Sequence, residues 1–463
     1  MEKNIKIYLE EDNSINRYVI SIFSSFSKIP ITYSSIEESD LAFVSHLDKV
    51  SVSHNCLLVY SSLASSVNWN AITPNQTLES SSDDFCLRLN FLKAVELLTT
   101  DEVNSNTSDE AYDKHDRLKY EMSFQKINGF DAYPLVNRYF NILIKLLSDK
   151  FELKRGDLYP GGKKCAIILS HDVDYPQKYA SVYNYPWLPR GPIPEFLKLN
   201  VERLKSTILL LLDKNRSDYW LFDDIMKLES SFGFKSSFYF SSINRFMKWG
   251  SKNDVVYDIR QSRFKELFLS IQEAGFEVGL HPSYYAYKSL TNLTTEKELL
   301  ENCINKDVVG MRHHLWHMGK EVSRTLRMHN DAGFKYDSSI AFNNNIGFRR
   351  SIAIPYHPWD EIGNAPLDIL QIPMMAMDGN FFYKESNVYR AVDELLKYKN
   401  ILKIEGGVGA VDWHVRTSYP RNKEYFLWGT AYKEFLEELS LDKEVWVTNG
   451  EEFYNWFKSN ELK

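Results

Sequence analysis

Short apolar runs that end in charged or imidazole side chains recur through the last two thirds of the chain. The run at 166–169, Ala-Ile-Ile-Leu, leads into Ser-His-Asp-Val-Asp at 170–174. Three later segments, at 275–281, 308–314 and 409–414, repeat this arrangement and end in histidine or in arginine followed by histidine. Short apolar runs bounded by turn residues are typical of buried strands. The pattern therefore predicts strands whose ends carry the chemistry of the protein.

The beginning of the chain has a different pattern, in which short apolar runs alternate with serine- and asparagine-rich turns. The runs at 5–9 and 56–60 predict strands, and 134–147 has the periodicity of an amphipathic helix. This part carries no catalytic signature. We therefore expect three parts: an N-terminal α/β domain of unknown role at 1–150, a turn-rich linker at 151–162 and a second domain at 163–463.

An insertion at 176–230 separates the first two predicted strands of the second domain. Its proline-rich segment 185–194 cannot form a regular helix, because proline lacks the amide donor and clashes with the preceding turn. The insertion follows Asp174 directly, so its aromatic residues could form one wall of a substrate cleft. The alternative is a surface loop with helices packed behind it.

Length, composition and charge agree with a globular protein of two domains. The chain has 463 residues, of which 44% are hydrophobic and 25% are charged. Its formal net charge of -7 and its scattered lysines and arginines argue against a nucleic-acid partner, which would need a basic face. The sequence does not determine the oligomeric state.

The cysteines and the apolar segments indicate in which cellular compartment the protein is expected. Cys56, Cys86, Cys165 and Cys303 lie far apart and lack metal-binding or redox spacing, which predicts free thiols in a reducing compartment. The first residues do not lead from a basic segment into an apolar stretch, and the apolar run 208–212 is far too short for a membrane span. We therefore expect a cytoplasmic protein without a membrane span.

Asp172 and Asp174 are the strongest candidates for a reactive site. Two residues apart at a strand end, their carboxylates face the same side and repel each other unless a cation or an arginine compensates them. An Asp-x-Asp pair can also belong to a loop that caps the next helix. Because three further strand ends supply His281, Arg312 and His414, we predict one shared, metal-assisted site.

These motifs, together with Gly-Phe-Lys-Tyr-Asp-Ser-Ser at 333–339 and Val-Trp-Val-Thr at 445–448, resemble the polysaccharide deacetylase family over roughly the last 300 residues. This family includes N-deacetylases of chitin and peptidoglycan. The resemblance implies a distorted parallel (β/α) barrel, here with an extra N-terminal α/β domain. More narrowly, the chain resembles a cytoplasmic branch with such a domain that is associated with surface-polysaccharide synthesis.

The resemblance also implies a role for each motif residue. Asp172 would be the catalytic base and Asp174 a metal ligand, while Arg312 would hold Asp172 and His414 would act as the acid. The second motif of the family has two metal-binding histidines four residues apart. Here His281 matches the first of them, and a tyrosine stands in the place of the second.

The third protein ligand therefore has to be sought elsewhere. His314 lies two residues after Arg312, so on an extended chain both side chains face the site, and we predict His314 as the third ligand. Contact with the substrate is its alternative role. His313 should face away, and His317 should lie on the following loop. Tyr285 offers only a neutral phenol, a poor ligand, so a second water is the other alternative.

The resemblance implies a metal-dependent hydrolase that removes an acyl group, which we expect to be acetyl, from the nitrogen of an amino sugar. The expected substrate is an N-acylated sugar or glycoconjugate, in surface-polysaccharide or precursor metabolism. The expected cofactor is a divalent metal, with zinc as our prediction. Two alternatives stay open. One is a hydrolase of the same fold that acts on a non-sugar amide, even without a metal, and the other is a non-catalytic carbohydrate-binding protein.

Overall fold

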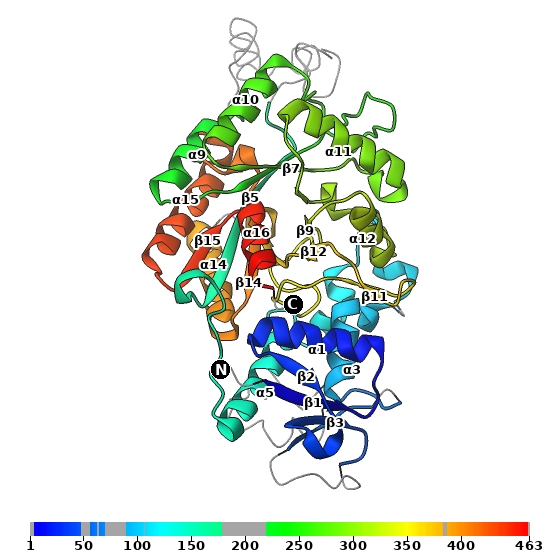
Figure 1. Cartoon of the computed structure of the whole chain (residues 1–463). Coiled ribbons are helices and arrows are strands. Elements are labelled where there is room, and N and C mark those ends of the chain that lie inside the picture. The colour runs from blue at the N-terminus through cyan, green and yellow to red at the C-terminus, as the bar shows by residue number, and fades with distance from the viewer. Residues whose placement is uncertain are drawn as a thin grey trace, which may run out of the picture.

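The computed structural model describes residues 4–47, 56–62, 64–69, 89–105, 107–177, 219–382 and 387–461. Most of the predicted insertion, including the proline-rich segment 185–194, lies outside the described residues, as does Cys86. Figure 1 shows a strand-helix assembly in its upper part and a smaller sheet with helices in its lower part.

The larger sheet has nine strands, and all of its strand pairs are parallel. The strands pair in the order β12-β9-β8-β7-β6-β5-β14-β13, and β15 also pairs with β5. Their bounds are β5 (Cys165–Val173), β6 (Ser237–Phe240), β7 (Glu277–Leu280), β8 (Gly310–Met311), β9 (Tyr336–Asp337), β12 (Leu370–Gln371), β13 (Met374–Met377), β14 (Val408–Asp412) and β15 (Val445–Thr448).

One short segment connects the two ends of this sheet. β12 pairs with β9, and β13, which follows after only two residues, pairs with β14. At the junction, the Ile372 amide donates to the carbonyl of Asp337 at 2.9 Å, and the Ala410 amide donates to the carbonyl of Pro373 at 2.9 Å. The sheet therefore curls round on itself, and the predicted distorted parallel (β/α) barrel is confirmed.

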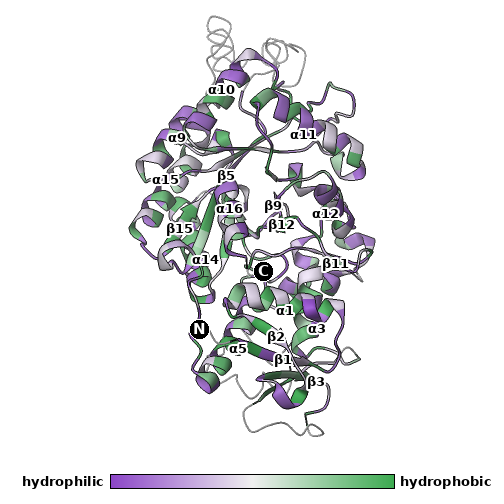
Figure 2. Ribbon diagram, viewed as in Figure 1, coloured by the Kyte–Doolittle hydropathy of each residue, from purple (hydrophilic) through white to green (hydrophobic). Residues whose placement is uncertain are grey.

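Helices cover the outside of the curled sheet (Figure 1). In Figure 2 the central strands are mostly hydrophobic, whereas the surrounding helices carry many hydrophilic positions. Apolar strands with helices on their outer face are typical of α/β barrels. The helices are α9 (Phe222–Ser231), α10 (Ser262–Glu273), α11 (Leu290–Ile304), α12 (Val322–Asp331), α13 (Gly379–Phe382), α14 (Val388–Glu405), α15 (Phe426–Leu441) and α16 (Gly450–Asn460).

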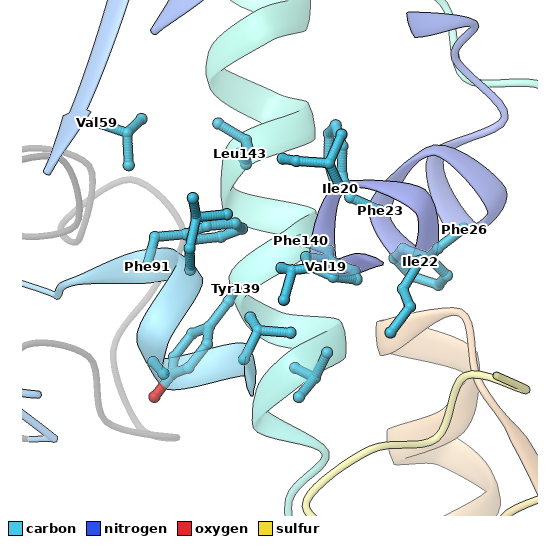
Figure 3. Close-up of a cluster of buried hydrophobic side chains, with 14 of the residues drawn as sticks. Val19, Ile20, Ile22, Phe23, Phe26, Val59, Phe91, Tyr139, Phe140 and Leu143 are labelled. Carbon is cyan, nitrogen blue, oxygen red and sulfur yellow. The ribbon is translucent and has the colours of Figure 1, made fainter. Parts of the chain in front are cut away.

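The N-terminal region has its own parallel sheet, in the order β2-β1-β3-β4. Its core forms where the helices that follow these strands meet, and Figure 3 shows Phe23, Phe91 and Phe140 gathered there. The Phe23 and Phe140 ring centroids lie 5.4 Å apart in an edge-to-face arrangement. The elements are β1 (Ile5–Leu9), α1 (Ser14–Ser27), β2 (Ile31–Tyr33), β3 (Leu41–Val44), β4 (Leu57–Tyr60), α3 (Phe91–Thr100), α4 (Phe124–Ile127) and α5 (Leu135–Phe151).

The N-terminal core also takes in side chains from the second part of the chain. Ile352, Ile354, Tyr356 and Trp359 are buried in the same hydrophobic cluster as α1, α3 and α5. Trp359 begins β10 (Trp359–Asp360), which pairs antiparallel with β11 (Ala365–Pro366). The N-terminal core is therefore completed by side chains from the second part of the chain.

Other sequence predictions can be compared with the described residues. The helix predicted at 134–147 is observed as α5, and the predicted strand at 5–9 is observed as β1. Cys56, Cys165 and Cys303 carry free thiols. Among the helices that the structure describes, none combines the length and the apolar character that a membrane crossing requires.

Candidate metal and catalytic site

Asp172, Asp174, His281, His314 and His414 come together at the C-terminal ends of the barrel strands. Asp172 is the last residue but one of the buried strand β5, and Asp174 follows the end of that strand. His281 follows β7 directly, and His314 and His414 follow β8 and β14 after short connections. Parallel strands direct their carboxyl ends to one face of a barrel, so residues far apart in sequence meet there.

Asp174, His281 and His314 form a buried group that could hold a metal ion, since one ligand atom from each lies within 4.8 Å of the others. Asp174 Oδ1 is 3.4 Å from His281 Nε2 and 3.6 Å from His314 Nε2. This oxygen has no hydrogen-bond partner among the described residues, although it is buried. Tetrahedral zinc with bonds of about 2.0–2.1 Å holds neighbouring ligand atoms about 3.3–3.4 Å apart. The donor set suits a divalent metal ion, and the two distances from Asp174 Oδ1 are close to that spacing.

A hydrogen bond on the far side of its imidazole orients His281, and a carboxylate lies near the far side of His314. His281 Nδ1 donates to the carbonyl oxygen of Arg312 at 2.6 Å, so Nε2 is left to face the site. His314 Nδ1 lies 3.6 Å from Asp254 Oδ1. Asp254 is itself fixed, because it accepts the backbone amides of Tyr284 and Ser251, each at 2.6 Å. Outer partners of this kind hold metal-binding histidines in the correct tautomer.

Asp172 stands beside this group and is paired with Arg312. Arg312 Nη1 donates to Asp172 Oδ1 at 3.0 Å, and Asp172 Oδ2 lies 3.9 Å from His281 Nε2. The Arg312 guanidinium is fully buried and also donates to Ser338 Oγ at 3.0 Å. Burial, with the negative charge of Asp172 next in importance, raises the pKa of the adjacent Asp412 to about 7. The hydrogen bond from Arg312 orients the Asp172 carboxylate within the site.

His414 lies on another side of Asp174 and is held by Asp378. Its Nδ1 is 3.0 Å from Asp378 Oδ1, and its Nε2 is 3.2 Å from Asp174 Oδ2. Burial opposes the charged imidazolium, but the carboxylates of Asp378 and Asp412 outweigh it and hold the pKa of His414 well above its usual value. The ring is thus suited to carry a proton near neutral pH.

Asp254 and Asp378 were not assigned a role from the sequence. Asp378 directly follows the apolar strand β13, which is the same signal that marks the other strand ends. Asp254 lies in the loop between β6 and α10, where no apolar run precedes it closely. Arg416 was missed as well, and its Nη1 lies 3.7 Å from Asp174 Oδ2.

The remaining candidates lie outside the ligand group. Tyr285 is 44% exposed and contributes no atom to it. His313 is buried and stacks on His329 with the ring centroids 5.6 Å apart. His317 lies on the following turn, and its Nδ1 donates to the carbonyl oxygen of Tyr284 at 2.9 Å.

No protein-family model matches the chain, and no curated protein matches it either. Among solved structures, a Mycobacterium smegmatis protein assigned as a polysaccharide deacetylase has a TM-score of 0.42 and 16% identity, over 66% of this chain and 94% of its own. The polysaccharide deacetylase Bc1974 from Bacillus cereus has a TM-score of 0.30 and 12% identity, over 62% and 91% of the two chains.

A third similar structure is a mutant of BA3943, described as a CE4 family pseudoenzyme with restored enzymatic activity. It has a TM-score of 0.32 and 13% identity, over 64% of this chain and 69% of its own. Because all three TM-scores and identities are low, the function has to be inferred from the residues and geometry of the site.

Proposed function

We propose that the protein is a metal-dependent hydrolase that removes an acyl group, most simply acetyl, from the nitrogen of an amino sugar. The observation that carries this proposal is the convergence of three groups at one barrel mouth. These are a metal-ligand set of Asp174, His281 and His314, a carboxylate beside it, and an imidazole on another side. Metal-assisted hydrolysis of an amide uses these three functions: a Lewis acid, a base for the water and an acid for the leaving amine.

The proposed base is Asp172. A divalent ion held by the three ligands would supply Lewis acidity for the amide carbonyl and for water. Asp172 would take the proton of the attacking water, since its Oδ2 lies 3.9 Å from His281 Nε2 and so borders the ligand group. Arg312 would keep this carboxylate charged and aimed through its 3.0 Å hydrogen bond to Oδ1.

The proposed acid is His414. Its Nδ1 is occupied by Asp378, so Nε2 is the nitrogen that faces the site. In the protonated form, His414 would give its Nε2 proton to the leaving amine as the carbon-nitrogen bond breaks. Asp378 would stabilise the imidazolium before the transfer and fix the orientation of the ring.

Aromatic side chains beside the ligand group support a sugar substrate. The rings of Tyr284 and His317 lie 4.0 Å apart, and Tyr285 extends from the same loop with 44% of its surface exposed. Sugar rings present apolar faces that pack well on such side chains. In this proposal Tyr285, which stands where a second histidine would be expected, serves the substrate and not the metal.

The proposal can be tested by measuring acetate release from N-acetylated sugars and glycoconjugates, with the purified protein before and after chelation and after zinc is restored. We expect release that stops on chelation and returns with zinc. Release that is insensitive to a chelator would favour the metal-independent alternative. Saturable sugar binding without any release, by zinc-loaded protein, would favour a non-catalytic carbohydrate-binding protein.

A further inference from the structure

The turn that carries His314 has an unfavourable backbone conformation. Leu315 has a φ of 55° and Trp316 a φ of 51°, so two successive residues that are not glycine lie in the left-handed region. This conformation is unfavourable for any residue other than glycine and persists only where its surroundings impose it. Something in the fold must therefore hold this turn.

A hairpin from the N-terminal region contacts the turn. The hairpin spans 111–119 and is closed by a hydrogen bond from the Lys119 amide to the carbonyl oxygen of Ala111 at 2.8 Å. Tyr112 and Leu118 form an antiparallel bridge across it. Its tip, residues 113–117, contacts this turn at the C-terminal face of the barrel. Arg117 and Leu315, which make the contact, are 198 positions apart in the sequence.

Arg117 makes the direct contact. Its Nη1 donates to the carbonyl oxygen of Leu315 at 2.8 Å and to Asn343 Oδ1 at 2.5 Å. On the other side, Nε and Nη2 donate to Asp113 Oδ2 at 2.9 Å and 2.7 Å, so the guanidinium is itself fixed by its own hairpin. The planar guanidinium of arginine has several donors in a fixed arrangement, so it can bind these acceptors at the same time. The flexible ammonium group of lysine is much less suited to this.

The other tip residues hold the hairpin against the same barrel loops. His115 Nδ1 and the hydroxyl of Tyr284 share a hydrogen bond of 2.8 Å, and Asp116 Oδ2 lies 3.5 Å from His317 Nε2. Behind the turn, a cavity of about 520 Å³ is bordered by Trp316, Met318 and Arg117. Trp316 itself packs into the barrel core, but the turn also borders this cavity, and the hydrogen bond from Arg117 is one of the contacts that hold it there.

We propose that Arg117 is a positioning residue for the metal centre: through the carbonyl of Leu315 it holds the strained turn that directs His314 to the metal. This inference rests on the proposed metal site and extends it to the N-terminal region. The N-terminal region would then increase the affinity of the site for the metal, although the proposed ligands, Asp174, His281 and His314, all lie in the second part of the chain.

The test is the affinity of the full-length protein for Zn²⁺, measured by competition with a chromophoric chelator and independent of turnover. Arg117→Ala should weaken zinc binding by about tenfold or more, the scale on which outer partners of metal ligands act. Arg327→Ala is the matched control, because Arg327 also lines the cavity and pairs with an aspartate, Asp360, and among the described residues it donates no hydrogen bond to the turn. It should bind zinc as the wild type does.

A double-mutant cycle shows whether Arg117 acts through His314. If it does, adding Arg117→Ala to His314→Ala should cost no further zinc affinity, because the ligand that Arg117 positions is already absent. Adding Arg117→Ala to His281→Ala should still cost affinity. Equal losses in both backgrounds would mean that Arg117 affects the whole fold, which overturns the proposal.

Folding of each variant is checked by circular dichroism and thermal unfolding without metal. If Arg117→Ala does not fold, Arg117→Lys takes its place, since lysine keeps the charge beside Asp113 but cannot serve all the acceptors of the fork. It should lose part of the zinc affinity. Unchanged zinc affinity in the folded Arg117 variant would disprove the positioning role of Arg117 and leave the metal site standing. A wild-type protein that binds no zinc would disprove the proposed metal site itself.

Discussion

Buried carboxylates lie at both ends of the barrel: Asp174 at the C-terminal ends of the strands, here called the mouth, and Glu277 at the N-terminal ends, here called the floor. Their pKa values are shifted in opposite directions. At the mouth, Asp174 faces His281, His314 and His414. At the floor, Glu277 begins β7, and its hydrogen-bond donors within the described part of the chain are all neutral. These are Ser237 Oγ at 2.5 Å, the Tyr336 hydroxyl at 2.7 Å and the Glu451 amide at 2.8 Å.

Burial works against ionisation at both places, and the neighbours decide the outcome. The imidazoles of His281 and His414 outweigh burial and hold the pKa of Asp174 well below its usual value. Burial dominates at Glu277 and raises its pKa to about 7. A buried acid is therefore not in itself a sign of a functional site, and the imidazole partners are what distinguish the mouth from the floor.

The largest expected effect is the loss of a ligand at the mouth. His281→Ala and His314→Ala should each weaken zinc binding by more than ~100-fold, because each removes one of three protein ligands and not merely an outer partner. Tyr285→Phe is the control and should bind zinc like the wild type. Zinc content and affinity of the three variants, measured side by side, check this. Wild-type zinc affinity in His314→Ala would leave His314 as a substrate contact only.

Asp172→Asn should separate chemistry from metal binding. We expect it to lower the rate of acetate release by ~100-fold or more, the usual scale for a lost general base, while zinc binding and the unfolding temperature stay close to wild type. The measurement is kcat on the best N-acetylated substrate together with zinc content. A variant that keeps its full rate would show that Asp172 is structural.

Asp254→Ala should have a smaller effect on the same centre. Asp254 touches the metal site only through His314, whose Nδ1 lies 3.6 Å from its Oδ1. We expect zinc affinity to fall by about 10- to 100-fold. Asp258→Ala in the same loop is a suitable control, since Asp258 pairs with the surface residue Arg260. If both variants lose affinity equally, disturbance of the loop and not the lost carboxylate is responsible.

The smallest effect is expected at the floor, and it concerns stability alone. Because the pKa of Glu277 is raised from 4.5 to about 7, the unfolded chain releases this proton at lower pH than the folded protein does. The folded state therefore loses stability as pH rises between about 4.5 and 7. Glu277→Gln should flatten this part of the curve and leave zinc affinity unchanged. Denaturation midpoints of both proteins across that window provide the measurement, and parallel curves would contradict the assignment.

The sequence reveals the mouth of the barrel where polar residues lie at or just after the end of an apolar run. Asp172, His281 and His414 are of this kind, because strand alternation and the common direction of parallel strands are enough to place them together. The repeated runs predict the strands, whereas the curled barrel is what the resemblance of the motifs to the polysaccharide deacetylase family implies. The convergence of His314 with Asp174 and His281 could be anticipated from its spacing to Arg312.

The outer partners could not be predicted in this way. Asp254 reaches His314 from a long loop, and the path of such a loop depends on packing that leaves no periodic trace in the sequence. The contact of Arg117 with Leu315 joins segments 198 positions apart, and the hairpin that makes it contains no apolar run. Local patterns specify elements and their faces, whereas the docking of one irregular segment on another is decided by the whole fold.

The strip formed by Ile352, Ile354, Tyr356 and Trp359 has a practical consequence for anyone who wishes to dissect the protein. A gene shortened at the predicted linker would encode a barrel whose strip has lost the helices that cover it. Newly bared apolar surface of this kind promotes self-association and poor yield. Useful fragments would need polar replacements along the strip, and exchange of N-terminal regions between relatives would succeed only if the strip were exchanged with them.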